Sequence, residues 1–390
     1  MEKVKIGIIG IGNMGSQHIQ FISQLRNCTL TAICDIREDV LERYRDEKSF
    51  AKFSDSETFF READTDAVII ATPHYSHVPL ALRALECGKH VIVEKPIAVE
   101  KADAERLVAA APQYPSQRLC AMFCQRTIPA HIRIKRLIDS GELGRIMRVN
   151  WIITSWFRTQ FYYDSGDWRA SWRGEGGGVL LNQCPHQLDL MQWFFGMPER
   201  ISAHMTFGKY HDIEVEDDVT AYLEYPSGAT GVFIASTGEA PGTNRLEIMA
   251  DRGRVVLENG KLTFLRNETP VSRFCRESRV AFSSPECWDV TIPTRMYNEH
   301  MHRDIIENFA ESILHNVPLI APAVEGIRGL ELGNAMLLSH LEKRPVELPI
   351  DSALFSEHLK KLIEGSRYQK KAPPAKTAAE PPSDFGKSFN

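Results

Sequence analysis

The stretch Lys5–Ile19, KIGIIGIGNMGSQHI, decides the fold of this chain. An apolar run ends at Gly10, and Gly12 and Gly15 complete a G-x-G-x-x-G pattern before a segment of helical character. A strand, a glycine turn and a helix in this order are typical of a dinucleotide-binding unit, because the glycines let a pyrophosphate approach the backbone and the helix N-terminus offers N–H groups. The alternative is a glycine turn in another kind of α/β protein.

A second signal favours the dinucleotide. The run LTAICD ends in Asp35, 20 residues after Gly15. A carboxylate at this distance accepts hydrogen bonds from the adenosine ribose hydroxyls and repels a 2′-phosphate, so we predict NAD. Arg37 offers charge to a phosphate, which keeps NADP possible. The residues expected to contact the cofactor here are Gly10, Gly12, Asn13, Met14, Gly15, Asp35, Ile36 and Arg37.

Composition limits the class of protein. The 390 residues are enough for two domains, and 43% hydrophobic with 25% charged residues are ordinary for a globular protein. The net charge of −5 argues against general nucleic-acid binding, and no apolar run is long enough to span a membrane. The eight cysteines form no C-x-x-C pair, so we expect a cytoplasmic protein without a zinc cluster.

Two halves of the chain differ in pattern. Up to about residue 125, short apolar runs alternate with helical segments, which predicts a doubly wound parallel sheet. From Ile146 onward, strands joined by turns such as PSG, DRG and ENG predict an open, mostly antiparallel sheet, interrupted by one helix over 179–195. We therefore predict a Rossmann domain at 1–125 and an α+β domain at 126–365. The proline-rich end, 366–390, is expected to be disordered.

The chain resembles the Gfo/Idh/MocA oxidoreductases, which include glucose-fructose oxidoreductase and inositol dehydrogenases. The motifs that carry the resemblance are GIGNMG at 10–15, ATPHYSH at 71–77, EKP at 94–96, FCQRTIP at 123–129, GGGVLLNQCPHQLDL at 176–190 and EGIRGLELGNAMLLS at 325–339. The resemblance implies a substrate site beside the nicotinamide, and pairing of subunits through the sheet of the second domain.

Lys95 is the strongest catalytic candidate. It follows an apolar strand, and ligands of open α/β sheets bind beyond the carboxyl ends of strands. A partly desolvated lysine beside a nicotinamide cation suits acid–base work, which is the role that the resemblance implies for it. Glu94 would position Lys95. The alternative is a surface lysine at a strand end.

Asn182 and His186 complete the predicted catalytic set. They are four residues apart, so on one helix they would share a face. The resemblance implies an aspartate at position 182, and an amide there cannot take a proton, which leaves Lys95 and His186 as the proton-transfer pair. Asp189 would orient the histidine ring or, alternatively, lie on the helix surface; Pro185 would start or kink the helix.

Further site residues come from three segments. By resemblance, the ATPHYSH loop lies along the cofactor, whereas a zinc site at its histidines lacks ligand spacing, so no metal is predicted. The aromatic and basic segment 157–178, with Trp156 before it, suits a polyol pocket, although each aromatic could equally pack within a loop. The cofactor contacts expected here are Ala71, Thr72, Pro73, His74, His77, Glu94, Lys95 and Gln125. The substrate contacts are Lys95, Trp156, Tyr162, Tyr163, Trp168, Arg169, Trp172, Asn182 and His186.

These features predict an NAD(P)-dependent oxidoreductase that acts on a secondary hydroxyl of a sugar, glycoside or cyclitol. Two alternatives use the same parts. One is a glycosidase that works by transient oxidation and elimination, and the other is a non-catalytic NAD-binding sensor. The strand VTAYLEY at 219–225 carries apolar residues on both faces, so a homodimer or homotetramer is expected.

Overall fold

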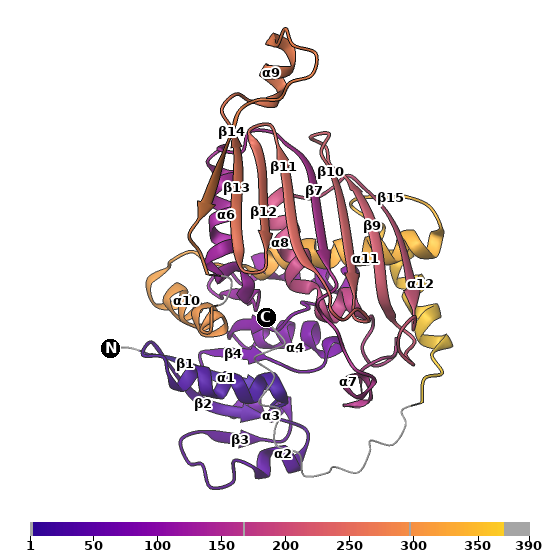
Figure 1. Cartoon of the computed structure of the whole chain (residues 1–390). Helices are drawn as coiled ribbons and strands as arrows, with labels where there is room; N and C mark the ends of the chain where they lie inside the picture. Colours follow the sequence, from indigo (N-terminus) through magenta and orange to yellow (C-terminus); the bar gives the residue numbers. More distant parts are fainter. Residues whose placement is uncertain (1–2, 167, 296–297, 370–390) are drawn as a thin grey trace. The chain divides into compact units, whose positions relative to one another are not determined.

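The computed structural model describes residues 3–166, 168–295 and 298–369 (Figure 1). These residues form two compact units, each assembled from separate stretches of the chain. The first unit comprises Met1–Thr127, Pro185–Asp189 and Glu299–Glu331, and the second comprises Ile128–Cys184, Leu190–Asn298 and Leu332–Asn390. The predicted boundary at 125 lies two residues from the end of the first of these stretches. Most of the predicted disordered tail falls outside the described residues.

The first unit contains a six-stranded parallel sheet in the order β3-β2-β1-β4-β5-β6. Its strand β4 is buried along its whole length, and β1 and β5 are buried at all but one residue each, because helices cover both faces of a parallel sheet. This arrangement confirms the doubly wound sheet that the sequence predicts. The strands are β1 (Val4–Ile9), β2 (Cys28–Cys34), β3 (Ala51–Phe53), β4 (Ala67–Ile70), β5 (His90–Val93) and β6 (Leu119–Ala121).

Helices connect these strands. Asp55 caps one of them by accepting a hydrogen bond from the backbone N–H of Thr58 at 2.8 Å. A later helix, α10 (Met301–His315), packs against α1 through stacked Phe21 and His302 rings 5.5 Å apart. The other helices are α1 (Asn13–Ser23), α2 (Glu38–Glu42), α3 (Ser56–Glu62), α4 (His77–Glu86) and α5 (Lys101–Ala110), with 3₁₀ turns η1 (His74–Ser76), η2 (Ala111–Gln113) and η3 (Cys124–Thr127).

The second unit contains a nine-stranded sheet in the order β14-β13-β12-β11-β7-β10-β9-β8-β15. The described strand pairs are antiparallel except β7 with β10, so the predicted mostly antiparallel sheet is confirmed. The strands are β7 (Ile146–Ile153), β8 (Arg200–Phe207), β9 (Glu216–Glu224), β10 (Thr230–Ser236), β11 (Asn244–Ala250), β12 (Gly253–Glu258), β13 (Lys261–Asn267), β14 (Cys287–Ile292) and β15 (Val346–Glu347).

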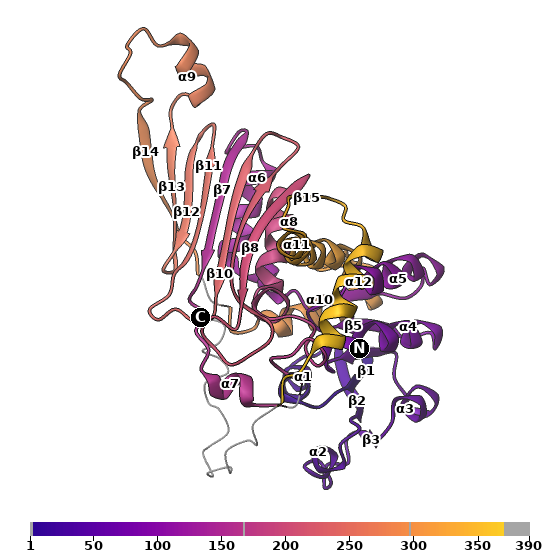
Figure 2. The same ribbon diagram turned by 90° about the vertical axis from the view of Figure 1, so that its right-hand side faces the viewer.

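Helices of the second unit gather on one face of this sheet, as Figures 1 and 2 show. Ser339 fixes one of them to β8 by accepting a hydrogen bond from Ala203 N–H at 3.1 Å. Side chains on the other face remain partly exposed, Tyr222 most clearly at 44%. The helices on this face are α6 (Pro129–Asp139), α8 (Pro185–Phe195), α11 (Ala323–Glu342), which begins in the first unit, and α12 (Ser352–Gly365). Two short helices, α7 (Gln160–Asp164) and α9 (Val271–Glu277), lie beyond opposite ends of the strands.

The prediction of one continuous helix over 179–195 is wrong, because the segment divides at Cys184. A π-helical turn, η4 (Val179–Gln183), ends at Cys184, and α8 begins at Pro185. The turn is closed by a hydrogen bond from Cys184 N–H to Val179 C=O at 2.9 Å, five residues apart. Pro185 occupies the first helical position, where its missing N–H costs nothing. Asn182 and His186 therefore do not lie on one face of one helix.

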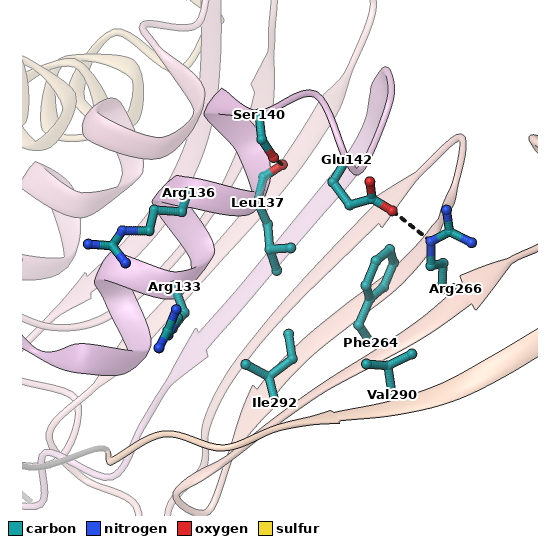
Figure 3. Close-up of a pocket in the computed structure, with 9 residues that line it drawn as sticks. All are labelled: Arg133, Arg136, Leu137, Ser140, Glu142, Phe264, Arg266, Val290 and Ile292. Carbon is teal, nitrogen blue, oxygen red and sulfur yellow. Dashed lines mark hydrogen bonds and ion pairs between the residues drawn. The ribbon is translucent and has the colours of Figure 1, made fainter.

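The second unit has a hollow of about 440 Å³ between α6 and the β13–β14 edge (Figure 3). At its rim Glu142 binds Arg266 at 2.6 Å. No residue predicted for the functional site lines it; those that do are Arg133, Arg136, Leu137, Ser140, Glu142, Phe264, Arg266, Val290 and Ile292. Within the described residues, no helix has the length and apolar character needed to cross a bilayer.

Candidate active site

The glycine turn of the first unit leaves room for a ligand beside the backbone. At Gly10, φ is 90°, and a Cβ there would lie 2.7 Å from the carbonyl oxygen of Ala71. A Cβ at Gly15 would lie 1.9 Å from the Gly10 carbonyl oxygen, so α1 packs closely on β1. A Cβ at Gly12, by contrast, would meet nothing within 4 Å. No side chain among the described residues caps the N-terminus of α1, which leaves its first N–H groups to water or a ligand.

Asp35 is fixed at the end of β2. Its Oδ2 accepts a hydrogen bond from Ile11 N–H at 2.8 Å, and its Oδ1 accepts one from Arg37 N–H at 2.9 Å. The Arg37 guanidinium lies 3.7 Å from the carboxylate. Ile36 is 85% exposed, an unusual state for a large apolar side chain. The carboxylate and this apolar side chain fit the ribose and the adenine of a dinucleotide.

The loop after β4 lies against the glycine turn through a hydrogen bond from Ala71 N–H to Ile9 C=O at 2.8 Å. The Thr72 hydroxyl is buried without a hydrogen-bond partner among the described residues, which marks a place for a ligand atom. The two ring nitrogens of His77 lie 2.8 Å from the Thr72 carbonyl and 2.7 Å from the Pro96 carbonyl. Burial lowers the pKa of His77, and its ring joins the Thr72 loop to the segment that follows Lys95.

Glu94 and Lys95 follow β5. Glu94 is buried, and its Oε1 lies 2.7 Å from His18 Nε2 of α1. Burial alone would raise the pKa of Glu94, but the hydrogen bond and charge of His18 outweigh it and lower that pKa to about 2. Its Oε2 accepts a hydrogen bond from the backbone N–H of Lys95 at 3.1 Å. Glu94 thus positions Lys95 through the main chain, and Lys95 itself is half-buried.

His186 belongs to a buried cluster of the first unit. Its Nε2 lies 3.9 Å from the thiol sulfur of Cys124, which also lies 3.5 Å from Nε2 of His302. Burial raises the pKa of Cys124 well above its usual range, so the thiol stays protonated. Burial also lowers the pKa of His302 to about 4, so this ring is neutral at pH 7. The thiol has one proton to donate and thus serves one imidazole at a time.

Asp189 does not lie on a helix surface. Arg126 donates two hydrogen bonds to its carboxylate, at 2.6 and 2.8 Å, and both side chains are 1% exposed. A third Arg126 nitrogen binds Glu325 at 2.6 Å. This bidentate pair holds the first turn of α8, and hence His186, to η3. Nearby, Gln125 accepts a hydrogen bond from Gln187 at 3.2 Å.

In the second unit, Asn182 belongs to a polar network. Its Nδ2 donates to a Glu175 carboxylate oxygen in a short hydrogen bond and to the Tyr162 hydroxyl at 3.3 Å. That hydroxyl also accepts hydrogen bonds from Arg169 at 2.6 Å and from Gln183 at 2.9 Å. We call Tyr162, Arg169, Glu175, Asn182 and Gln183 the amide network. It brings together three of the predicted substrate residues.

A buried carboxylate supports the backbone beneath the amide network. Glu216 of β9 accepts hydrogen bonds from the N–H groups of Gly178 at 2.9 Å and Leu180 at 3.1 Å. Burial raises the pKa of Glu216 to about 7. A Cβ at Gly178 would lie 2.0 Å from the Glu216 carbonyl oxygen, so only glycine lets η4 lie against β9.

The other predicted aromatics differ in their surroundings. Trp172 is buried edge-on against Phe207, and Tyr163 is buried with its hydroxyl 2.8 Å from Thr237, so both pack inside the second unit. Trp156 lies under the Arg158 guanidinium, and Trp168 lies 4.5 Å from that of Arg169. His74 is buried, with its ring 5.9 Å from that of His77. In the described part of the chain, no three His, Cys, Asp or Glu side chains are arranged to hold a metal ion.

Sequence reasoning missed His18, Cys124, His302 and Glu175. His18 had a signal in its place, three residues after Gly15 in the helix of the glycine motif. Glu175 had a signal in its place just before Gly176–Gly178. Cys124 and His302 are 178 residues apart, and no local pattern joins them.

Two family descriptions match the chain. Residues 4–120 match the NAD-binding Rossmann fold of the GFO/IDH/MocA oxidoreductase family, and residues 131–256 match the GFO/IDH/MocA C-terminal domain. The chain is 24% identical to myo-inositol 2-dehydrogenase of Thermotoga maritima, over 88% of this chain and 98% of that protein. It is 30% identical to Oxidoreductase P35 of Formosa agariphila, over 51% of this chain and 63% of that protein.

A solved structure agrees with both units. The WlbA dehydrogenase of Chromobacterium violaceum, crystallised with NADH and UDP-GlcNAcA, superposes with a TM-score of 0.77 at 25% identity, covering 90% of this chain and 97% of that one. The glycine turn, the Asp35 carboxylate and the partnerless Thr72 hydroxyl fit the same cofactor. The chain therefore belongs to the GFO/IDH/MocA family and is an NAD-binding oxidoreductase.

Proposed function

We propose that this protein is a dehydrogenase that oxidises a secondary hydroxyl of a sugar, glycoside or cyclitol, with Lys95 and His186 moving the proton. The observation that carries the proposal is the position of Lys95. It follows β5 at the carboxyl end of the parallel sheet, and the buried Glu94–His18 pair fixes its backbone. The same unit carries the glycine turn that fits the cofactor.

The cofactor would lie along Gly10–Gly15, with its ribose on Asp35 and the Thr72 loop beside it. When bound, NAD supplies the hydride acceptor. Lys95 takes the proton of the substrate hydroxyl, because hydride loss from an alcohol that keeps its proton would leave a strongly acidic protonated carbonyl. The buried imidazole of His186 relays this proton, and the protonated thiol of Cys124 lies 3.9 Å from its Nε2.

The substrate class rests on the amide network and on the relatives. Amide and phenol groups that are buried and fixed by one another suit the hydroxyls of a polyol. Trp156, Trp168 and Arg169 add faces and charge of the kind that sugar rings contact. A relative named myo-inositol 2-dehydrogenase, and a WlbA dehydrogenase crystallised with UDP-GlcNAcA, support a substrate of this class.

The experiment is a screen of inositols, free sugars, sugar acids and glycosides with NAD and with NADP, followed by absorbance of the reduced cofactor. Growth of that absorbance with one of these compounds supports the proposal. Release of sugar from a glycoside without accumulation of NADH would instead indicate cleavage by transient oxidation. Bound cofactor without turnover of any compound would indicate a sensor and contradict the proposal.

The protein is further proposed to be a cytoplasmic homodimer or homotetramer. In the described residues, all eight cysteines are free thiols and five of them are buried, in keeping with a reducing compartment. Tyr222 of β9 lies opposite Val232 of β10, and Tyr222, Val232 and Ile234 alternate with buried residues, so these three side chains share the less buried face of the nine-stranded sheet. These neighbouring apolar side chains, which are not fully buried, favour pairing with a second copy.

A further inference from the structure

We propose that Glu175 is a positioning residue that gives Asn182 the function of a carboxylate. The inference rests on the proposed function, in which Asn182 contacts a substrate hydroxyl. It concerns how the chain works with an amide at a position where its resemblance to the family implies an aspartate.

Glu175 is 1% exposed and is held by its own loop. One carboxylate oxygen accepts a hydrogen bond from Ala170 N–H at 2.7 Å, and the other accepts from Asn182 Nδ2. Ala170 has a φ of 69°, a left-handed conformation that costs a residue with a Cβ roughly 1 kcal/mol or more. At Gly174, a Cβ would lie 2.3 Å from the Trp168 carbonyl oxygen. The tight turn is thus built around the carboxylate.

The carboxylate fixes the orientation of the Asn182 amide. An ionised carboxylate only accepts hydrogen bonds, so Asn182 must point its NH₂ group toward Glu175. The other hydrogen of that group points to the Tyr162 hydroxyl at 3.3 Å. Both hydrogens of the amide therefore point into the network, the one toward Glu175 more firmly than the one toward Tyr162, whose oxygen also accepts from Arg169 and Gln183. What Asn182 presents to any further partner is its carbonyl oxygen, an acceptor, as an aspartate would present.

The negative charge that an aspartate would carry at position 182 is also retained. It lies on Glu175, one hydrogen bond away from Asn182. The guanidinium of Arg169 lies 3.9 Å from the Glu175 carboxylate and also binds the Tyr162 hydroxyl. A charge-assisted hydrogen bond from Asn182 to the carboxylate polarises the amide and makes its carbonyl oxygen a stronger acceptor. Asn182 thus accepts the hydrogen bond of a substrate hydroxyl without holding the charge itself.

The test is a reciprocal exchange. Asn182→Asp places two carboxylates in buried contact, and the two cannot be ionised at the same time without strong repulsion. We therefore expect a lower melting temperature and at least about a 10-fold fall in kcat/KM. Glu175→Gln removes the charge and the fixed orientation, with a fall of similar size. The double variant Glu175→Gln/Asn182→Asp restores one amide and one carboxylate, and we expect it to recover both stability and kcat/KM to within about 3-fold of the parent.

Glu277→Gln in α9 is the matched control, because it removes an exposed carboxylate by the same substitution. If the double variant is no better than Asn182→Asp in melting temperature and kcat/KM, the proposal is overturned. If the double variant does not fold, the single variant Glu175→Gln tests the proposal. A kcat/KM equal to that of the wild type in Glu175→Gln would also overturn the proposal. Were no polyol turned over by the wild type, the proposed function would fail, while recovery of melting temperature in the double variant would still support the Glu175–Asn182 pair.

Discussion

His18 Nε2 lies 2.7 Å from Glu94 Oε1, and both side chains are buried in the first unit. The pair connects the helix of the glycine motif to the residue before Lys95. Because His18 lowers the folded-state pKa of Glu94 to about 2, the pair stabilises the fold at pH values above the ordinary glutamate pKa. That contribution is lost as the pH falls from about 4.5 toward 2.

We expect His18→Ala to leave the Glu94 carboxylate buried with one partner fewer. The free energy of unfolding at pH 7 should fall by about 1–3 kcal/mol. The loss of stability between pH 4.5 and 2 should become smaller, because the pKa of Glu94 rises without the imidazole. Urea unfolding of both proteins at several pH values measures this. An unchanged acid dependence would contradict the assignment.

We expect Lys95→Ala to lower kcat by about 10²–10⁴, the usual contribution of a general base. NADH binding, followed by its fluorescence, should stay within a few-fold, because the glycine turn, α1 and Asp35 are untouched. His186→Ala should be slowed less, since Lys95 can pass its proton to solvent. Near-native turnover by Lys95→Ala across the pH range would show that another group takes the proton.

We expect the wild type to prefer NAD and Asp35→Ser to shift that preference toward NADP. The serine removes the charge that repels a 2′-phosphate and leaves the Arg37 guanidinium without the carboxylate 3.7 Å away. The ratio of kcat/KM for the two cofactors measures the shift. A wild type that favours NADP would be inconsistent with the role given to Asp35.

Because of Glu216, we expect the free energy of unfolding to fall as the pH rises from about 4.5 to 7. Its folded-state pKa is raised to about 7, so the folded protein keeps a proton that the unfolded chain has lost. The slope is at most about 1.4 kcal/mol per pH unit from this one group. We expect Glu216→Gln to remove that slope while keeping the hydrogen bond from one N–H group. Denaturant unfolding of both proteins between pH 5 and 8 measures this slope. An equally steep slope in the variant would show that a group other than Glu216 holds the proton.

Light scattering at micromolar concentration should give the mass of a dimer or a tetramer. Tyr222→Glu puts a charge on the open face of the nine-stranded sheet, and we expect it to yield a smaller assembly with an unchanged circular dichroism spectrum. Phe282→Glu, at a fully exposed aromatic residue outside the strands of the sheet, serves as the control for an added charge. A monomeric wild type would contradict the proposed association.

The sequence allowed both sheets to be predicted, because their signals are local. The glycine turn, Asp35 and the apolar runs of β1, β4 and β5 lie within short windows, and hairpin turns mark the antiparallel strands. Glu94 and His18 are 76 residues apart, and their pairing depends on how α1 lies against β5. A short stretch of sequence carries no information about that packing. Asp189 was placed either beside His186 or at the surface, and only the fold brings Arg126 to it.

The Glu175–Asn182 hydrogen bond spans only seven residues and was still not predicted. Its formation depends on the left-handed conformation of Ala170, which sequence patterns assign to glycine or asparagine. The change from a π-helical to an α-helical turn at Cys184 was likewise hidden, because the apolar spacing of 179–195 fits a continuous helix. Local backbone exceptions, rather than long sequence separation, limited the prediction in the second unit.

The π-helical turn has a consequence for insertions and deletions. Asn182 and Gln183 are consecutive, yet both amides reach the Tyr162 hydroxyl, at 3.3 and 2.9 Å. Successive side chains diverge less around this wider turn, which holds one residue more than an α-helical turn. Deleting a single residue between Val179 and Gln183 would tighten the turn and swing one amide away, even if every side chain in the amide network were kept. Chain length in these five residues is thus as strict a requirement as their identity.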